Sequence, residues 1–468
     1  MKHISKCAGW TVLCLTARSP YEILVDMVAP NALHDSGAIY DPPKCHPNTR
    51  VAVLDKMMNW VQRKDSETKD HFAMWLNGSA GAGKTAIARS FIKSCLRDNL
   101  IIASFFFERY DSSRNHAEPL IATLVYQIYQ SLPEVQNEIR SIIGADPLLF
   151  KRSLELQFTE LIINPLCRLR SSATSRLSQG PLVIVIDGLN ECISREAQQL
   201  VLRMISSHSE DKEFGLTILL LITSRPEREI RTVFDSQQME NAATQLYLDD
   251  TFKPDEDIRI FLKDSFDEIK TRHIFRSSIP DSWPTPAAIE YLVEKASGQF
   301  IHPETVLQYV KSPRHRPQQR LDAVMNLRPP FKDHPFGQLD ALYTAVLSVT
   351  MDTERILYAL SIYSLNVINQ NSNIRFDISE FMSLDEVETS DLLPELGTVV
   401  QLERIPNRPD TLKKVPGSLQ DFLLDPARSR NFFIDADTYY KKHVASILGY
   451  LTPPMGAPSS CIPLFPLT

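Results

Sequence analysis

The chain has 468 residues, enough for several buried cores, so its folding needs neither a metal nor disulfide staples. Its 57 acidic and 50 basic residues give a formal net charge of -7, which argues against a dedicated nucleic-acid-binding protein, because phosphate neutralisation needs a basic face. The seven scattered cysteines include no CxxC pair and indicate free thiols in a reducing compartment. No apolar run approaches the length of a membrane span. We expect a cytoplasmic protein that binds neither nucleic acid nor membrane.

The first 40 residues show no clear pattern, and we treat 1–40 as an unassigned N-terminal extension. A proline-rich break at Pro42–Pro47 precedes an amphipathic helix pattern at Val51–Val61. Helical patterns then alternate with five short apolar runs, at Ala73–Leu76, Ile101–Phe107, Leu182–Ile186, Leu216–Ile222 and Gln245–Leu248. The third and fourth runs hardly alternate, which is typical of parallel strands buried on both faces. This rhythm predicts an α/β domain over residues 41–250.

The loop after the first apolar run matches the GxxxxGK[ST] phosphate-loop pattern at every fixed position. Its eight residues, all expected to contact nucleotide, are Gly78, Ser79, Ala80, Gly81, Ala82, Gly83, Lys84 and Thr85. Glycines let backbone N–H groups turn inward around phosphate oxygens, and a helix beginning at Lys84 adds the positive end of its dipole. Lys84 is expected to reach the β- and γ-phosphates, and the Thr85 hydroxyl to coordinate Mg²⁺. The alternative, a chance glycine-rich turn, does not explain the strand before it and the helix pattern after it.

Two acidic residues follow the third apolar run, in the segment Asp187-Gly188-Leu189-Asn190-Glu191. An acid at the carboxyl end of a buried parallel strand sits where ligands bind in open α/β sheets, so we expect Asp187 to bind Mg²⁺ directly or through water. Glu191 is placed to take a proton from the attacking water as a general base. A solvated loop carboxylate would give the same pattern as Glu191, and the sequence alone leaves both interpretations open.

The fourth apolar run ends in a polar cluster, Thr223-Ser224-Arg225-Pro226. Arg225 is a candidate to sense or stabilise phosphate charge, and the alternative is a surface arginine in an ordinary ion pair. The sequence contains no NKxD motif of the kind that guanine-specific GTPases use. We therefore expect ATP and ADP as ligands, with Mg²⁺, and leave GTP as the alternative.

Beyond residue 250 the pattern turns helical, with segments at Asp257–Ile269, Pro286–Ala296 and Glu304–Val310. The basic, proline-containing stretch Lys311–Arg320 is either an exposed hinge, which its prolines favour, or a localisation or nucleic-acid signal. Helical patterns return at Leu339–Leu347 and Glu354–Leu365. We divide this part into a helical segment with a hinge over residues 251–340, a mixed domain over 341–435 and a tail over 436–468.

These motifs together resemble the NACHT-domain NTPases of the STAND class of signalling switches. The resemblance is closest to the set found in mushroom-forming fungi, and a nephrocystin-3-like N-terminal module describes the same region. Besides the phosphate loop, LVIVIDGLNE and LLITSRP, the segments that carry it are Pro43–Arg50, Ala296–Phe300, Leu339–Tyr343 and Asp421–Pro426.

The resemblance implies a P-loop sheet of the ASCE type, in which an extra strand separates those ending at Asn77 and Asp187. It also implies a helical lid over 251–340, a winged-helix-like domain over 341–435, and a segment Cys45–Arg50 near the adenine. Such proteins are similar in resting closed on ADP, exchanging it for ATP, opening, and self-associating into signalling oligomers.

The chain departs from the family pattern at two positions. Asn190 stands where the family usually has an acid; an amide can still hold a magnesium-bound water, so Asn190 is an expected cofactor contact, with slow hydrolysis. Pro416 replaces a histidine of the winged-helix segment, which puts the closed ADP-bound state in doubt.

Three functions fit these observations. The first is a STAND-type switch that binds ATP and hydrolyses it slowly. The second is a nucleotide-binding scaffold or degenerate remnant without significant hydrolysis, and the third is a mechanical AAA-type ATPase with rapid turnover. The nucleotide retained after purification and the steady-state rate of hydrolysis distinguish the three functions. Retained ADP favours the switch, and fast hydrolysis favours the mechanical ATPase. A protein with neither retained nucleotide nor hydrolysis would be the remnant.

Overall fold

The computed structural model describes residues 6–7, 10–11, 18–37, 42–78, 81–170, 176–178, 180–208, 218–296, 298–325, 337–348, 352–365, 400–403, 411–415 and 417–451. The chain divides into two compact units, Met1–Asp257 and Ile258–Thr468. The division falls inside helix α12 (Pro254–Arg272), close to the boundary expected at residue 250. Each unit is described by itself.

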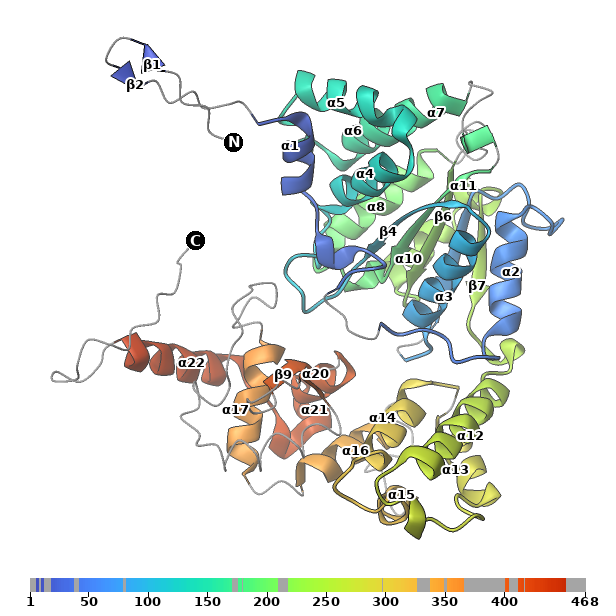
Figure 1. Cartoon of the computed structure of the whole chain (residues 1–468), viewed down its shortest axis with the longest axis vertical. Helices are drawn as coiled ribbons and strands as arrows, with labels where there is room; N and C mark the ends of the chain where they lie inside the picture. Colours follow the sequence, from blue (N-terminus) through green and yellow to red (C-terminus); the bar gives the residue numbers. More distant parts are fainter. Residues whose placement is uncertain are drawn as a thin grey trace. The chain divides into compact units, whose positions relative to one another are not determined.

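The first unit is built on a five-stranded sheet in the described residues, with strand order β4-β5-β6-β3-β7 (Figure 1). All four neighbouring pairs are parallel. The strands are β3 (Ala73–Asn77), β4 (Ile101–Phe106), β5 (Leu182–Asp187), β6 (Ile218–Ser224) and β7 (Ala243–Tyr247). The predicted parallel α/β fold is confirmed, and β6 is the strand that separates β3 from β5.

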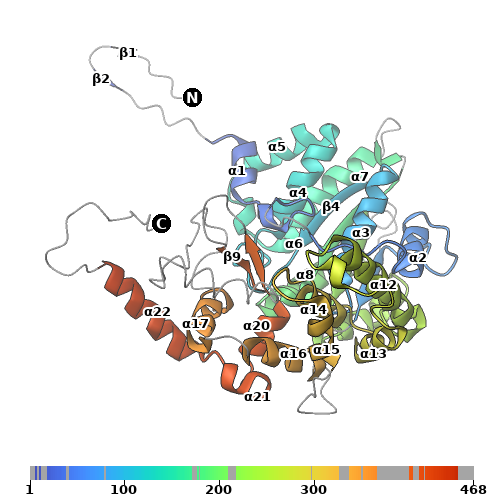
Figure 2. The same ribbon diagram turned by 60° about the horizontal axis from the view of Figure 1, so that its bottom comes forward.

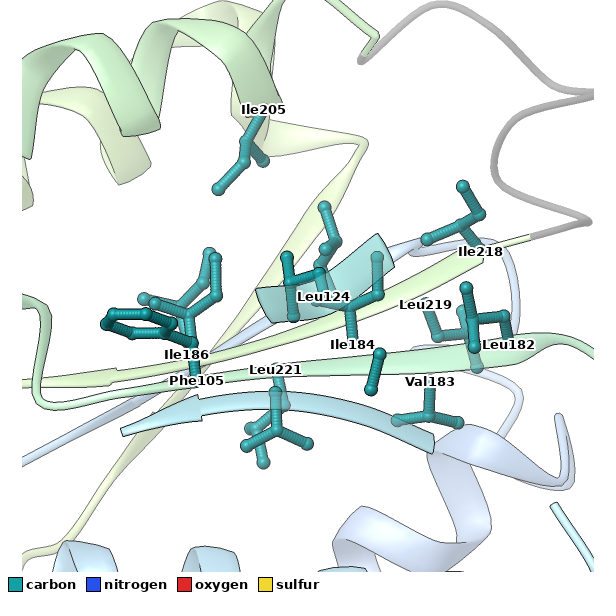
Figure 3. Close-up of a cluster of buried hydrophobic side chains, with 14 of the residues drawn as sticks. Phe105, Leu124, Leu182, Val183, Ile184, Ile186, Ile205, Ile218, Leu219 and Leu221 are labelled. Atoms are coloured by element: carbon teal, nitrogen blue, oxygen red, sulfur yellow. The ribbon is translucent and has the colours of Figure 1, made fainter. Parts of the chain in front are cut away.

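Helices cover both faces of this sheet, and β3, β4, β5 and β6 are therefore buried along their whole length. Ile184 points to the side on which Leu124 of α4 (Leu120–Ser131) and Ile205 of α8 (Arg195–Ser206) lie, whereas Val183 points to the opposite side (Figure 3). Helix α3 (Lys84–Arg97) packs on β4, β5 and β6, and α2 (Val51–Val61) packs beside α3. The remaining helices of the unit are α1 (Pro20–Asp26), α5 (Gln136–Ala145), α6 (Leu154–Phe158), α7 (Asn164–Arg170), α10 (Arg228–Phe234) and α11 (Gln237–Glu240).

Residues 18–37, which the sequence left unassigned, belong to this unit. Helix α1 packs against α4 and α5, as both views show (Figures 1 and 2). Leu24 and Ala32 are fully buried, and the Ala29 N–H donates to the Thr123 hydroxyl of α4 at 3.0 Å. The core of the first unit therefore begins well before residue 41.

The outer side of end strand β4 is hydrogen-bonded by a side chain instead of another strand. The Gln127 amide of α4 accepts from the Ser104 N–H at 3.0 Å and donates to the Ser104 carbonyl at 2.8 Å. Gln127 thus imitates a neighbouring peptide group and satisfies two backbone groups that an end strand would otherwise leave unpaired.

The second unit is helical in most of its described residues. It continues α12 with α13 (Pro286–Ala296), α14 (Ile301–Val310), α15 (Pro317–Met325), α16 (Gly337–Ser348) and α17 (Thr353–Ser364). An antiparallel ladder of β8 (Gln401–Glu403) and β9 (Thr411–Lys414) precedes α20 (Gly417–Leu423), α21 (Pro426–Ser429) and α22 (Ala436–Leu451), and α22 packs against α17 (Figure 2).

Two segments that carry the family resemblance meet in this unit, where the ring centroids of Tyr343 and Phe422 lie 5.5 Å apart, and residues beside the second segment add polar contacts. Arg428 donates to both oxygens of Asp340, at 3.1 and 2.7 Å, and the Tyr343 hydroxyl lies 2.8 Å from the Ser418 hydroxyl. Helix α15 begins at Pro317, so the second part of the stretch expected to be an exposed hinge is helical, and a hinge role for Lys311–Arg316 stays a prediction. The winged-helix-like assignment stays a prediction, since residues 366–399 and Pro416 lie outside the described residues.

No helix among the described residues is long and apolar enough to cross a membrane. The cysteines Cys45, Cys95, Cys167 and Cys192 are free thiols.

We predict that Gln127→Ala destabilises the first unit by about 2–6 kcal/mol, because two buried backbone groups each lose a partner worth about 1–3 kcal/mol. Urea unfolding gives the free energy, and hydrogen exchange should speed up at the Ser104 amide. Gln130→Ala, on the same helix but exposed, is the matched control and should change stability by about 0.5 kcal/mol or less. Unchanged exchange along β4 in Gln127→Ala would show that another group protects this edge.

Candidate functional site

The phosphate loop joins the end of β3 to the start of α3, and its glycines take conformations that other residues adopt at a cost. Gly81 and Gly83 have φ values of 77° and 88°, in the left-handed region. A Cβ placed on Gly83 would meet no atom within 4 Å, so the inner side of the loop is open there. A Cβ on Gly78 would approach the Leu248 Cβ to 3.0 Å, so packing also requires glycine. Ser79 and Ala80 lie outside the described residues.

Three elements meet at the carboxylate of Asp187, whose side chain is buried (2% exposed residue). The Thr85 hydroxyl of α3 donates to Asp187 Oδ2 at 2.7 Å, and the Thr223 hydroxyl of β6 donates to Oδ1 at 2.6 Å. Burial raises the pKa of Asp187, while these two hydrogen bonds and the charges of Arg89 and Lys84 oppose the rise. A cation is the natural further partner of such a carboxylate.

The oxygen atoms of Thr85 and Asp187 fit a magnesium ion that also binds phosphate. Mg²⁺ prefers hard oxygen ligands and is commonly held by one or two protein groups together with phosphate and water. Among the described residues no group of three or more His, Cys, Asp or Glu side chains could hold a metal by itself. The two oxygen donors of Thr85 and Asp187 suit Mg²⁺ carried with a nucleotide, which brings its own phosphate ligands.

Lys84 is the buried cation of the loop. Its Nζ donates to the Gly78 carbonyl at 2.8 Å. Burial, with a smaller contribution from the nearby charge of Arg225, lowers the pKa of Lys84 to about 8, whereas Asp187 and Glu191 act in the opposite direction. An incoming anion that replaces the lost solvation would stabilise the charged form of Lys84.

The oxygen and the nitrogen of the Asn190 side-chain amide both form hydrogen bonds within the protein. Its Oδ1 accepts from the Arg225 N–H at 2.9 Å, and its Nδ2 donates to Glu191 Oε1 at 3.0 Å. The residue is only 2% exposed. Asn190 therefore joins the tip of β5 to the tip of β6 and orients Glu191; its expected contact with nucleotide or magnesium-bound water stays a prediction.

Glu191 lies between two arginines at this edge of the sheet. Its Oε1 is 3.8 Å from Arg225 Nη2, and its Oε2 is 3.8 Å from Arg109 Nε. Its side chain is 26% exposed, so solvent reaches the carboxylate. The two interpretations of Arg225, phosphate sensor and ion-pair partner, are compatible, because the ion pair lies within the site itself.

Gly188 explains how Glu191 is kept in this position. Its φ of 70° is in the left-handed region, and a Cβ there would lie 3.2 Å from Glu191 Cγ and 3.3 Å from the Phe107 carbonyl oxygen. Any side chain at this position would press on Glu191. Sequence reasoning missed Arg109, and the signal that could have found it is a basic residue just beyond the end of β4, the strand next to β5.

The comparisons with known proteins agree with a P-loop domain in the first unit. Residues 52–225 match the family model described as nephrocystin 3, N-terminal. Among solved structures, a Walker-type ATPase of Pyrococcus abyssi is 15% identical with a TM-score of 0.38, over 81% of this chain and 97% of that one. Cdc6p of Pyrobaculum aerophilum is 12% identical with a TM-score of 0.37, over 86% of this chain and 98% of that one.

No curated protein matches the chain. Similarities this low to solved structures do not transfer an activity. The complete phosphate-loop motif, its place between β3 and α3, the parallel sheet and the family match identify the first unit as a nucleotide-binding P-loop NTPase domain.

We predict that nucleotide affinity is constant below about pH 8 and falls above it. Below its pKa of about 8 the free Lys84 is already charged. Above it, Lys84 must take up a proton to pair with phosphate, so affinity falls by up to about tenfold per pH unit. The second ionisation of a phosphate monoester has a pKa of about 6 and is nearly complete before pH 8, so it does not produce this slope.

Titration with a fluorescent ATP analogue between pH 7 and pH 9.5 measures this dependence, and calorimetry in two buffers at pH 8.5 should show proton uptake. Lys84→Arg, which stays charged throughout, is the control and should show neither effect. A flat profile for the wild type would contradict a lowered pKa of Lys84 in the free protein.

Proposed function

We propose that this protein is an ATP-binding switch of the STAND type that hydrolyses ATP slowly. The observation that carries the nucleotide part is the 2.7 Å contact between Thr85 and Asp187, with Lys84 in the same phosphate loop. This arrangement joins a hydroxyl, a carboxylate and a cation, which are the groups that a magnesium–triphosphate complex requires.

Each group has a distinct task in this proposal. Lys84 and the loop N–H groups bind the phosphates, and Thr85 and Asp187 hold Mg²⁺. The metal, when bound, would neutralise charge on the β- and γ-phosphates. Glu191 orients the attacking water and accepts its proton, and the two arginines beside it balance charge near the terminal phosphate.

Slow hydrolysis follows from the surroundings of Glu191. Glu191 lies beside two arginine cations and accepts a hydrogen bond from Asn190, and it must give up part of these contacts to orient a water and accept its proton. A slow enzyme suits a switch, whose output is a conformation that must persist while ATP is bound. Adenine is favoured over guanine because the sequence lacks the NKxD motif.

The second unit supports the switch proposal only through its sequence resemblance to the STAND class. Its helices occupy the range in which the STAND resemblance implies a lid. A nucleotide-binding scaffold without significant hydrolysis is the second candidate, favoured by the full engagement of the Asn190 amide within the protein. Self-association on ATP binding distinguishes the two, since a scaffold has no reason to respond to the terminal phosphate.

We predict that Lys84→Ala weakens ATP and ADP binding by at least about tenfold, because a charge-assisted contact to phosphate is worth about 1.5–3 kcal/mol. Displacement of a fluorescent ATP analogue measures it. Lys93→Ala, which removes an exposed lysine from the same helix, is the control and should bind normally. Wild-type affinity in a folded Lys84→Ala protein would remove the basis of the nucleotide proposal.

We predict that Glu191→Gln slows hydrolysis by about 10²–10⁴-fold while leaving ATP affinity nearly unchanged, because the amide keeps the shape of the side chain and removes the proton acceptor. Single-turnover hydrolysis measures the rate, with Glu196→Gln, an exposed carboxylate in the first turn of α8, as the control.

Light scattering on the same Glu191→Gln samples tests the switch. A variant that accumulates with ATP bound should form larger assemblies with ATP than with ADP. Hydrolysis at the wild-type rate would contradict the role of Glu191. Loss of hydrolysis without any nucleotide-dependent change in size would leave a slow ATPase and contradict the switch.

A further inference from the structure

A buried arginine outside the phosphate-loop motif contacts the loop backbone. Arg50 is 4% exposed, and its guanidinium Nη2 donates to the Ala82 carbonyl at 3.0 Å. The family resemblance places the segment Cys45–Arg50 near the adenine but gives the Arg50 side chain no contact with the phosphate loop, and Arg50 lies before the region that the family model matches.

The Ala82 carbonyl fixes the direction of an N–H group in the loop. Because a trans peptide is planar, the carbonyl of Ala82 and the N–H of Gly83 belong to one rigid plane and point in opposite directions. A guanidinium that holds the Ala82 carbonyl therefore turns the Gly83 N–H away from Arg50. Gly83 also lies where the loop is open and caps α3 at its N-terminus, the positive end of the helix dipole.

Arg50 is in turn held in place by an acid from a distant part of the sequence. Asp257 Oδ2 accepts from the Arg50 backbone N–H at 3.0 Å and lies 4.0 Å from its guanidinium Nε. Asp257 sits in the first turn of α12. One carboxylate thus contacts both the backbone and the side chain of the arginine, which restricts the side chain to the direction of the loop.

The local backbone is built to place Arg50 there. Asn48 and Arg50 have φ values of 62° and 57°, conformations that residues other than glycine rarely adopt and that the surrounding structure must stabilise. The segment is attached to the phosphate-loop helix by the Cys45 N–H, which donates to the Ser90 hydroxyl at 3.0 Å. The backbone conformation of residues 45–50 thus places the Arg50 guanidinium within hydrogen-bonding distance of the Ala82 carbonyl.

We propose that Arg50 is a positioning residue for phosphate binding: it orients the Ala82–Gly83 peptide so that the Gly83 N–H faces the phosphates, and Asp257 holds it in register. The inference rests on the proposed nucleotide function and adds to it a residue pair that acts on the loop without touching the ligand.

The test compares ADP with AMP, because a loop N–H that faces the β-phosphate contributes to ADP alone. Affinities are measured by displacement of a fluorescent ATP analogue from the full chain. Arg50→Met, which keeps the length of the side chain but removes the donors, should lower ADP affinity on the order of tenfold and leave AMP affinity unchanged.

Two variants guard against a result that reflects folding alone. Arg50→Lys keeps a cation near Asp257 and should recover part of the ADP affinity. Asp257→Asn keeps an acceptor for the Arg50 N–H without its charge and should cause a smaller loss of the same kind. Arg97→Met, an exposed arginine at the end of α3, is the matched control and should bind both nucleotides like the wild type.

Equal losses of ADP and AMP affinity in Arg50→Met would place Arg50 in the fold or the base pocket and overturn the proposal, as would unchanged ADP affinity. The Lys84→Ala variant distinguishes failure of the Arg50 proposal from failure of the proposed nucleotide function. If Lys84→Ala loses ADP binding and Arg50→Met does not, only the role of Arg50 fails. If neither variant affects binding, the phosphate site itself is wrong.

Discussion

The first unit depends on keeping one carboxylate, that of Asp187, in the interior at the end of a strand. A buried carboxylate is stable only when hydrogen bonds and positive charge replace the water it has lost. Hydroxyls from Thr85 and Thr223 supply the bonds, and they come from the helix after the phosphate loop and from the neighbouring strand. The carboxylate therefore ties β5, β6 and α3 together, and the strand order that puts β6 beside β5 is what makes this possible. The same atoms that hold the fold together are those that we propose bind Mg²⁺ and the phosphates.

Much of this could be predicted from sequence because the signals are local. The phosphate loop, the apolar strands and the helices Val51–Val61 and Pro286–Ala296 follow from residue spacing within short windows. The strand inserted between β3 and β5 was implied by the family resemblance and not by any local signal, and the sheet confirms it. Contacts between distant residues could not be predicted. Arg50 meets Asp257 across about two hundred positions, and only the fold brings them together. The packing of residues 18–37 was missed for the same reason, since a short helix that fits a distant groove carries no periodic signal of its own.

The departure at Asn190 makes local sense in the structure. An amide has both a donor and an acceptor, so it can receive the Arg225 N–H and donate to Glu191 at the same time. An ionised aspartate at this position could do only the first, and would place a second negative charge beside Glu191. Asn190 therefore orients Glu191, and the proposed role of Glu191 is what separates a slow ATPase from a scaffold that only binds nucleotide.

The N-terminal segment determines where the boundaries of a recombinant fragment of this domain should lie. The family match spans residues 52–225, yet Leu24 and Ala32 are fully buried in the same core, and edge strand β7 follows the match at Ala243–Tyr247. The Arg89 guanidinium, which lies on the phosphate-loop helix over the Phe106 ring, donates to the His34 carbonyl. A recombinant fragment drawn from the motif boundaries would therefore lose an edge strand and part of its core, and with them a support of the nucleotide site. A fragment that contains residues 18–257 keeps both helix α1 and strand β7.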